Sequence, residues 1–218
     1  MCTFKQIAVS NWELFAGSYR TKSQDAYLAH LAQLTAPDAM IVREKHLAED
    51  AYTKLFSALW ERCRNAGWET GHADSRGMQA GFFGCCGSTP VLIPHTYVLA
   101  ARETKSPYLH LPLHLLERYR KEGKLDGIPW IGASVHSPEE AALAERLGAS
   151  YVTAGHIFAT GCKAGLLPRG ISFLEKVCQS VSIPVYAIGG IHPSNLGKIQ
   201  DTKAAGACMM SEYMCRPL

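Results

Sequence analysis

Residues 131–155 read IGASVHSPEEAALAERLGASYVTAG, and this stretch decides the fold class. Its two ends, Ile131–Val135 and Tyr151–Gly155, are short apolar runs of the length typical of buried strands. Ser-Pro-Glu-Glu at 137–140 predicts a capped helix start, because the serine oxygen can accept from a backbone N–H three residues later. Gly148 predicts the helix end. Strand, helix and strand in this order predict two parallel strands joined by a right-handed crossover.

The same alternation continues towards the end of the chain. Apolar residues spaced as on one helix face run from Leu174 to Val181, and Pro184–Ile188 reads as a buried strand. Ser194–Ala205 predicts a further helix, closed by Gly206. Ala207–Met210 predicts the last strand. The second half of the chain therefore contains four expected strands separated by helices or turns.

The first half shows the pattern less regularly. Its expected elements are the strands Lys5–Ser10, Ala39–Lys45, Val91–Pro94 and Tyr108–Leu111, a helix around Gln24–Leu34, and a long helix with one face formed by Tyr52, Leu55, Phe56, Leu59 and Cys63. Eight strands alternating with helices predict a single-domain (β/α)8 TIM barrel over residues 1–218. A Gly-rich stretch fits no regular element, so we expect an insertion at 68–90, before the third strand. The sequence ends at Leu218, so we expect a shortened closing helix.

Composition narrows the class of protein. The formal net charge is only +3 and no cluster of lysine and arginine concentrates it, which argues against nucleic acid as a partner. No apolar run reaches the length of a membrane span and no leader pattern opens the sequence, so we expect a cytoplasmic location without a membrane partner. The eight cysteines form no Cys-x-x-Cys pair, which indicates buried reduced thiols rather than a zinc site.

Two loops at the end of the chain point to an anion. Gly189-Gly190 follows the seventh expected strand, and Met210-Ser211 follows the eighth. In a β/α barrel these two loops commonly form a phosphate site, because glycine allows backbone N–H groups to approach the anion. A plain turn at Gly189-Gly190 is the simpler alternative.

Charged and polar residues stand at the carboxyl ends of two other strands. Arg43 and Lys45 alternate with Glu44, so both cations can point to one face and meet an anionic substrate. Two solvated rim charges are the alternative. Ser134 and His136 end the fifth strand and are expected to bind substrate.

His156 directly follows the sixth expected strand, which places it at the carboxyl rim. An imidazole can both take and return a proton near neutral pH, so His156 is the candidate acid–base residue. A hydrogen-bonded structural histidine is the alternative. The polar loop that follows, Thr160-Gly161-Cys162-Lys163, is expected to line the pocket. Cys162 is not expected to be a nucleophile, because no matching Cys/His/Asn pattern accompanies it.

These stretches carry a family resemblance. The segments IGASVHS at 131–137, GHIFATGCKAG at 155–165, Arg169-Gly170 and IPVYAIGGI at 183–191 resemble the thiamine phosphate synthase/TenI superfamily. In both branches of that superfamily an arginine ends the second strand and a lysine follows the sixth, matched here by Arg43 and Lys163. The resemblance implies a TIM barrel acting on a phosphorylated thiazole.

Three positions separate the two branches. The synthases usually carry Asn-Asp-Arg after the third strand and Gly-Gln-x-Asp after the fourth, whose acids hold Mg²⁺. This chain has Pro94-His95-Thr96 and Pro112-Leu113-His114-Leu115 there, without those acids, and Mg²⁺ prefers oxygen ligands. The synthases usually have Gly-Pro after the sixth strand, whereas this chain has Gly155-His156, as TenI does.

The resemblance to TenI implies a thiazole tautomerase that needs no metal and no cofactor. It would aromatise the carboxythiazole ethyl phosphate, with His156 moving a proton from ring carbon C2 to the exocyclic carbon. Gly190 and Ser211 would hold the phosphate, and Arg43, Lys45 or Lys163 the carboxylate. A synthase-like transferase with a relocated metal and a non-catalytic phosphate-binding regulator stay open, as does a homo-oligomer.

Overall fold

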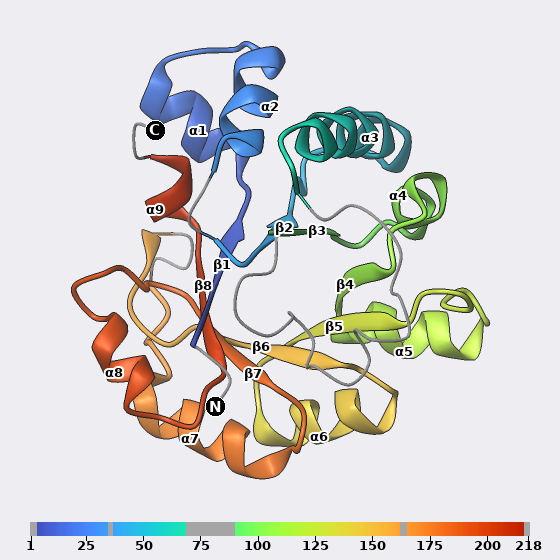
Figure 1. Ribbon diagram of the computed structural model, residues 1–218. Helices are drawn as coiled ribbons and strands as arrows, with labels where there is room; N and C mark the ends of the chain where they lie inside the picture. The colour runs from blue at the N-terminus through green and yellow to red at the C-terminus, as the bar shows by residue number, and fades with distance from the viewer. Residues whose placement is uncertain (1–3, 35–36, 69–89, 162–164, 216–218) are drawn as a thin grey trace.

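The computed structural model describes residues 4–34, 37–68, 90–161 and 165–215. Eight parallel strands lie in the order β3-β2-β1-β8-β7-β6-β5-β4, and Figure 1 shows them at the centre of a ring of helices. The strands are β1 (Lys5–Val9), β2 (Ala39–Val42), β3 (Val91–Pro94), β4 (Tyr108–Pro112), β5 (Trp130–Val135), β6 (Tyr151–Gly155), β7 (Val185–Ile188) and β8 (Gly206–Met209). The predicted (β/α)8 TIM barrel is confirmed.

The barrel is nearly closed, and its seam lies between β3 and β4. The other neighbouring strands pair in parallel register, as where Ile7 of β1 lies opposite Cys208 of β8. In the described part of the chain, β3 and β4 share only an isolated parallel bridge between His95 and His110. Both histidines stand near the carboxyl ends of their strands, so the seam reaches the rim where a barrel of this class binds its ligand.

Helices cover the outside of the strands (Figure 1). They are α1 (Trp12–Tyr19), α2 (Gln24–Ala32), α3 (Glu49–Asn65), α4 (Val98–Thr104), α5 (Leu113–Lys121), α6 (Pro138–Arg146), α7 (Gly170–Ser180), α8 (Leu196–Gln200) and α9 (Ser211–Met214). Ser137 caps α6 as predicted, its side chain accepting from the N–H of Glu140 at 3.1 Å. Gly148 has the predicted left-handed conformation after α6, with φ +78°.

The core has two layers. Between strands and helices lie apolar side chains such as Leu31, Phe56 and Leu174. Inside the barrel the filling includes Tyr151 and Tyr186, whose rings meet edge to face. Gly132 leaves room for Tyr151, because a Cβ at that glycine would lie 2.1 Å from the tyrosine ring. Tyrosine rings therefore fill part of the barrel interior, beside aliphatic side chains such as Ile7 and Ile93.

Some predicted boundaries are wrong. Strand β2 ends at Val42 rather than at Lys45, because Glu44 turns away to bind groups of the segment after β1. The helix expected over 194–205 is the shorter α8. Gly206 does not cap that helix; it opens β8, where a Cβ would lie 2.1 Å from the carbonyl oxygen of Lys5.

Helix α1 was not predicted, although Asn11 caps it by accepting from the N–H of Leu14 at 2.8 Å. The insertion expected at 68–90 lies almost wholly outside the described residues. The closing helix is short as expected: α9 packs against α1, and the ring of His30 lies 2.7 Å from the carbonyl oxygen of Tyr213.

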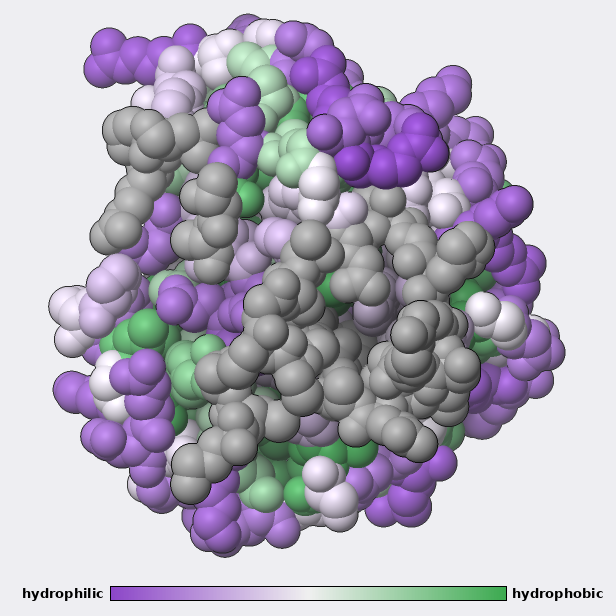
Figure 2. All heavy atoms as spheres, in the orientation of Figure 1, coloured by the Kyte–Doolittle hydropathy of each residue, from purple (hydrophilic) through white to green (hydrophobic). Residues whose placement is uncertain are grey.

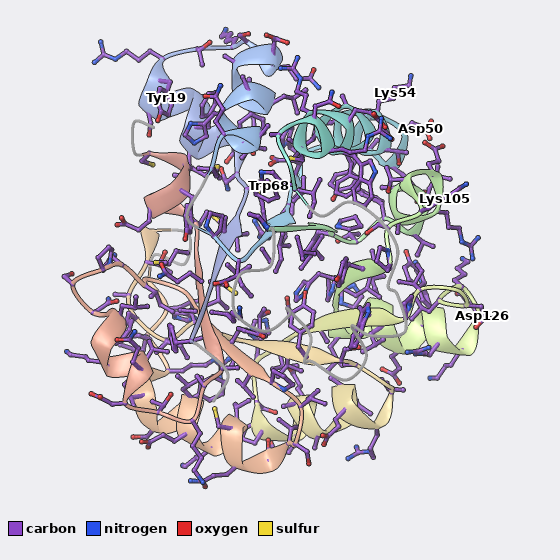
Figure 3. The ribbon with its side chains drawn as sticks, in the orientation of Figure 1. Tyr19, Asp50, Lys54, Trp68, Lys105 and Asp126 are labelled. Atoms are coloured by element: carbon purple, nitrogen blue, oxygen red, sulfur yellow. The ribbon has the colours of Figure 1, made fainter. Side chains whose placement is uncertain are left out.

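The edge of the face shown in Figure 2 is mostly polar. In Figure 3 the residues Asp50, Lys54, Lys105 and Asp126 lie on the outer side of the helices. None of the described helices has the length and apolar character to cross a membrane. Four described cysteines are free, and Cys215 is exposed, so the expectation that the thiols are buried is wrong there.

Candidate functional site

One pocket opens at the carboxyl ends of the strands, with a volume of about 440 Å³. This is a usual size for a small-molecule site. Eleven of the predicted site residues line it: Arg43, Lys45, Ser134, His136, His156, Thr160, Gly161, Gly189, Gly190, Met210 and Ser211. The other two, Cys162 and Lys163, lie outside the described residues. Residues far apart in sequence thus meet at one site, as the barrel topology requires.

His156 is buried but unpartnered. Its side chain follows β6, the residue is only 6% exposed, and it lines the pocket. Neither ring nitrogen has a hydrogen-bond partner among the described residues. Burial of a polar group without a partner is costly, so a ligand in the pocket is the expected partner.

The backbone around His156 is held firmly against β7. The N–H of Ile157 donates to the carbonyl of Ile188 at 3.0 Å, and the N–H of Phe158 donates to that of Gly189 at 2.9 Å. The carbonyl of His156 itself accepts from the N–H of Arg169 at 3.0 Å. We call residues 156–159 the rim loop. Its hydrogen bonds fix the imidazole at the pocket wall.

Gly189 and Gly190 allow the rim loop to pack closely against the chain that follows β7. Both have positive φ, +102° and +65°. A Cβ at Gly189 would lie 2.5 Å from the Cβ of His156, and one at Gly190 would lie 2.3 Å from the carbonyl oxygen of Ala159. The two glycines are therefore needed for close approach of the rim loop, whether or not an anion also binds their N–H groups.

Asn195 holds the chain after the two glycines, and sequence reasoning missed it. Its amide nitrogen donates to the carbonyl of Gly190 at 2.8 Å, and its amide oxygen accepts from the N–H of His192 at 2.9 Å. The carbonyl of Gly190 is thus fixed by this side chain. Because this carbonyl is fixed, the orientation of the neighbouring backbone N–H groups relative to the pocket is fixed as well. Recognition of an anion by backbone N–H groups requires such a fixed orientation.

Glu44 orders the chain between the two pocket cations. Its carboxylate accepts from the Ser10 hydroxyl at 2.5 Å, from the Trp12 N–H at 3.0 Å and from the Tyr27 hydroxyl. Burial, and then the Glu44 charge, raise the pKa of Tyr27, so the phenol keeps its proton. With Glu44 tied inward, Arg43 and Lys45 reach the pocket, as predicted from their alternation.

A buried histidine, His110, connects to the pocket through a network that the sequence did not reveal. Its Nδ1 lies 2.9 Å from the hydroxyl of Tyr151, and its Nε2 lies 2.9 Å from the Oγ of Ser134. Thr153 donates to the same Ser134 oxygen at 3.3 Å. We call these four residues the pocket floor, and Ser134 and Thr153 are the two that line the pocket. Burial, followed by the charge of Arg43, lowers the pKa of His110 to about 3, so the ring is neutral.

His95 also lines the pocket. Its Nδ1 is 2.6 Å from the hydroxyl of Thr96, and its ring stacks on His110 with centroids 5.6 Å apart. Burial lowers its pKa well below the usual value, and the nearby imidazole of His110 and the cations Arg43 and Lys45 act in the same direction. His95 is therefore a neutral hydrogen-bonding group beside two cations.

His136 is held differently from His156. It is exposed, its Nδ1 lies 3.2 Å from the carbonyl oxygen of Gly155, and its backbone N–H donates to Glu140 at 2.5 Å. A proton on Nδ1 would leave Nε2 as an acceptor. His136 is thus oriented by the residue that precedes His156, and it stays the nearest rival for proton transfer.

The described lining residues do not suit Mg²⁺. They include cations, histidines, hydroxyls and glycines but no carboxylate, and Mg²⁺ prefers oxygen ligands with at least one acid. No group of three His, Cys, Asp or Glu in the described ranges lies close enough together to hold a metal. His95 and Leu115 stand where the resemblance implies that a synthase carries its two acids.

Comparison with known proteins identifies a family. A family model described as thiamine monophosphate synthase (TMP-TENI) matches residues 89–213. A thiamine-phosphate synthase of Pyrococcus furiosus is 44% identical over 84 residues, which cover 38% of this chain and 41% of that protein. A thiamine-phosphate synthase of Coprothermobacter proteolyticus is 37% identical over 101 residues, covering 46% of each. The matched stretches thus span less than half of the relatives' length.

The fold also matches a solved structure along its whole length. The thiamine phosphate pyrophosphorylase of Pyrococcus furiosus superposes with a TM-score of 0.69 over 98% of this chain and 88% of that one. Its sequence identity of 22% is low, so this likeness speaks to the barrel fold alone.

Proposed function

The chain belongs to the thiamine monophosphate synthase (TMP-TENI) family, and we propose that within it this protein is a thiazole tautomerase. The reaction would aromatise the carboxythiazole ethyl phosphate without a metal. The single observation that carries the proposal is His156, a buried imidazole that lines the pocket and whose ring nitrogens have no hydrogen-bond partner among the described residues.

The proposed step is a proton shift between two carbons. His156 takes the proton from ring carbon C2, and the electron pair of the broken C–H bond moves into the ring and side-chain double bonds. The same imidazole returns a proton to the exocyclic carbon, forming a new C–H bond. Histidine suits both halves because its imidazole changes charge near neutral pH.

Two sets of groups support a doubly anionic substrate. Arg43 and Lys45 reach the pocket from the β2 side, where they suit a carboxylate. Backbone N–H groups near Gly190 and Ser211, which line the pocket after β7 and β8, suit a phosphate. A substrate with a phosphate at one end and a carboxylate at the other matches this distribution.

A thiamine-phosphate synthase is the second candidate, and the names of the relatives favour it over the tautomerase. That reaction joins a pyrimidine pyrophosphate to the thiazole phosphate with Mg²⁺. The pocket residues argue against it, since no carboxylate is among the described lining residues. A protein that only binds the phosphorylated metabolite is the third candidate, and the unpartnered His156 argues for chemistry instead.

Two assays on the same preparation test the proposal. Freshly made non-aromatic carboxythiazole phosphate is supplied with EDTA, and aromatisation is followed against a sample without protein. Thiazole phosphate and pyrimidine pyrophosphate are supplied with Mg²⁺, and thiamine phosphate is measured. We expect catalysis in the first assay alone. Thiamine phosphate formation at an enzymatic rate would establish the synthase, and ligand binding without catalysis in either assay would establish a binder.

A further inference from the structure

The chain between β3 and α4 makes a turn with a strained backbone. Thr96 has φ +72°, in the left-handed region that β-branched residues rarely adopt. The N–H of Tyr97 donates to the carbonyl of His95 at 2.9 Å, which closes a γ-turn around Thr96. A γ-turn with positive φ is rare and strained, so contacts with the rest of the molecule must hold it in place.

Two neighbouring elements supply those contacts. The N–H of Thr96 donates to the carbonyl of His110 in β4 at 2.9 Å. The N–H of His95 donates to the hydroxyl of Tyr52 in α3 at 2.8 Å, and that hydroxyl donates to the carbonyl of Val42 at 2.6 Å. Strain that is maintained in this way beside a pocket is typical of functional sites.

The turn sets the Thr96 hydroxyl against the ring of His95. The hydroxyl lies 2.6 Å from Nδ1, and His95 is buried and lines the pocket. No residue in the described part of the chain hydrogen-bonds to Nε2. A hydroxyl both donates and accepts, so Thr96 supports either tautomer of a neutral ring. An anion in the pocket only accepts, and it therefore selects the tautomer in which Nε2 carries the proton and Thr96 donates to Nδ1.

The surroundings of His95 suit an anion. Arg43 and Lys45 line the same pocket and are close enough for their charges to act on the His95 ring. Burial, the imidazole of His110 and these two cations lower the pKa of His95, so the ring is neutral and a poor base. A neutral ring offers a directed N–H without adding a third positive charge. This side of the pocket thus combines two cations with one hydrogen-bond donor.

We propose that His95 donates a hydrogen bond from Nε2 to the carboxylate of the substrate, and that Thr96 is the positioning residue that orients the ring. This inference rests on the proposed function. The substrate carboxylate is attached to C2. When His156 removes the C2 proton, the electron pair of the broken C–H bond spreads from C2 into the carboxylate and towards the exocyclic carbon. The carboxylate oxygens thus gain negative charge, and a donor placed on them stabilises that charge as it develops. Proton return to the exocyclic carbon forms the new C–H bond and removes the added charge.

Matched variants separate this role from packing. His95→Phe keeps a flat ring beside His110 and removes both nitrogens. Thr96→Val keeps the branched shape and removes the hydroxyl, whereas Thr96→Ser keeps the hydroxyl and removes a methyl group. His114→Phe, at an exposed position of α5, is the control for the loss of a histidine.

The kinetic expectations follow from the donor role. His95→Phe should lower kcat by about 10²-fold, the loss typical of removing one donor that acts on a developing charge. Thr96→Val should show part of this loss with little change in KM, and Thr96→Ser should recover the greater part of kcat. Thermal unfolding is measured alongside, and His95→Phe decides if Thr96→Val does not fold. Near-normal kcat in His95→Phe, or equal kcat in the two Thr96 variants, would overturn the proposal.

A binding experiment separates this proposal from the proposed reaction. The ligands are the aromatic carboxythiazole phosphate and the thiazole phosphate that lacks the carboxylate, and affinities are measured by calorimetry. The intact protein and His114→Phe should prefer the carboxylated ligand. His95→Phe should lower this preference by about 10-fold, the worth of a hydrogen bond to a charged group.

The outcomes of the two measurements are distinct. The expected change in preference without any aromatisation by the intact protein would leave His95 as the carboxylate donor and refute the tautomerase. Aromatisation by the intact protein with the same preference in His95→Phe would support the tautomerase and refute the donor. An intact protein that does not prefer the carboxylated ligand would also refute the donor.

Discussion

The pocket floor and the rim loop each hold a buried histidine, and the two rings are held in opposite ways. In the floor, His110 has a partner for each ring nitrogen. In the rim loop, neither ring nitrogen of His156 has a partner in the described part of the chain, although the residue is only 6% exposed. Satisfied polar groups in a core give rigidity, whereas an unpartnered buried group costs stability. The hydrogen bonds of the pocket floor therefore fix the positions of its side chains. The rim loop leaves the imidazole of His156 available to bind a ligand.

The largest expected effect is on turnover. His156→Asn should lower kcat by about 10²- to 10⁴-fold, the usual contribution of general acid–base catalysis, and should leave ligand affinity and the unfolding temperature nearly unchanged. Aromatisation kinetics measure the loss. His136→Asn is the control, with a small effect expected. If the two losses were equal, proton transfer could not be assigned to the rim loop.

The next effect is on stability, with opposite signs in the two regions. His110→Leu removes the hydrogen bonds that the ring makes with Ser134 and Tyr151, at about 1–3 kcal/mol for each buried bond lost. His156→Leu removes an unpartnered imidazole from the interior and should raise the free energy of unfolding by about 1 kcal/mol. Denaturant unfolding of both variants measures this. If His156→Leu were destabilised as much as His110→Leu, His156 would also have a structural role, which would contradict the prediction.

A smaller effect tests how the rim loop is held. Gly190→Ala places a Cβ against the carbonyl oxygen of Ala159 at positive φ, so the loop must shift, at about 1–3 kcal/mol. Gly67→Ala is the matched control, since Gly67 has φ +84° but open space around its Cβ. The loss of stability should be larger at Gly190, and only that variant should lose turnover. Equal behaviour of the two would mean that close approach at Gly190 matters little.

The last effect is the pH dependence of stability that His110 contributes. Its pKa is about 3 when folded and near 6.5 when unfolded, so between those values the unfolded chain binds more protons. Stability should fall as pH drops from 6.5 towards 3, by at most about 1.4 kcal/mol per pH unit from this group. His110→Gln should flatten the profile of unfolding temperature against pH. If the profile of unfolding temperature against pH were unchanged in His110→Gln, the conclusion that the His110 ring is buried and neutral would be contradicted.

The sequence predicted the rim better than the floor. His156, Gly190 and Ser211 could be placed because each follows an expected strand, and parallel strands bring their carboxyl ends together. His110 stands within an apolar run and gave no signal, because its partners Ser134 and Tyr151 are 24 and 41 residues away. Pairing across the barrel depends on register and ring packing, which a periodic pattern does not encode.

Glu44 and α1 also show which features can be predicted from the sequence and which cannot. Glu44 was read only as a spacer between two cations, while its partners Ser10 and Tyr27 are 34 and 17 residues away. Helix α1, in contrast, had a local signal, since Asn11 is a favourable helix cap. Local chemistry is thus readable from the chain, and long-range polar contacts are not.

The most direct test of the central claim follows one proton. Substrate carrying deuterium at C2 is aromatised by the protein in ordinary water with EDTA, in a single turnover, and the product is examined by NMR. If His156 both removes and returns the proton, aromatisation is faster than without protein and part of the deuterium appears on the exocyclic carbon. Aromatisation no faster than in the protein-free sample, or product with no deuterium at that carbon, would contradict the account.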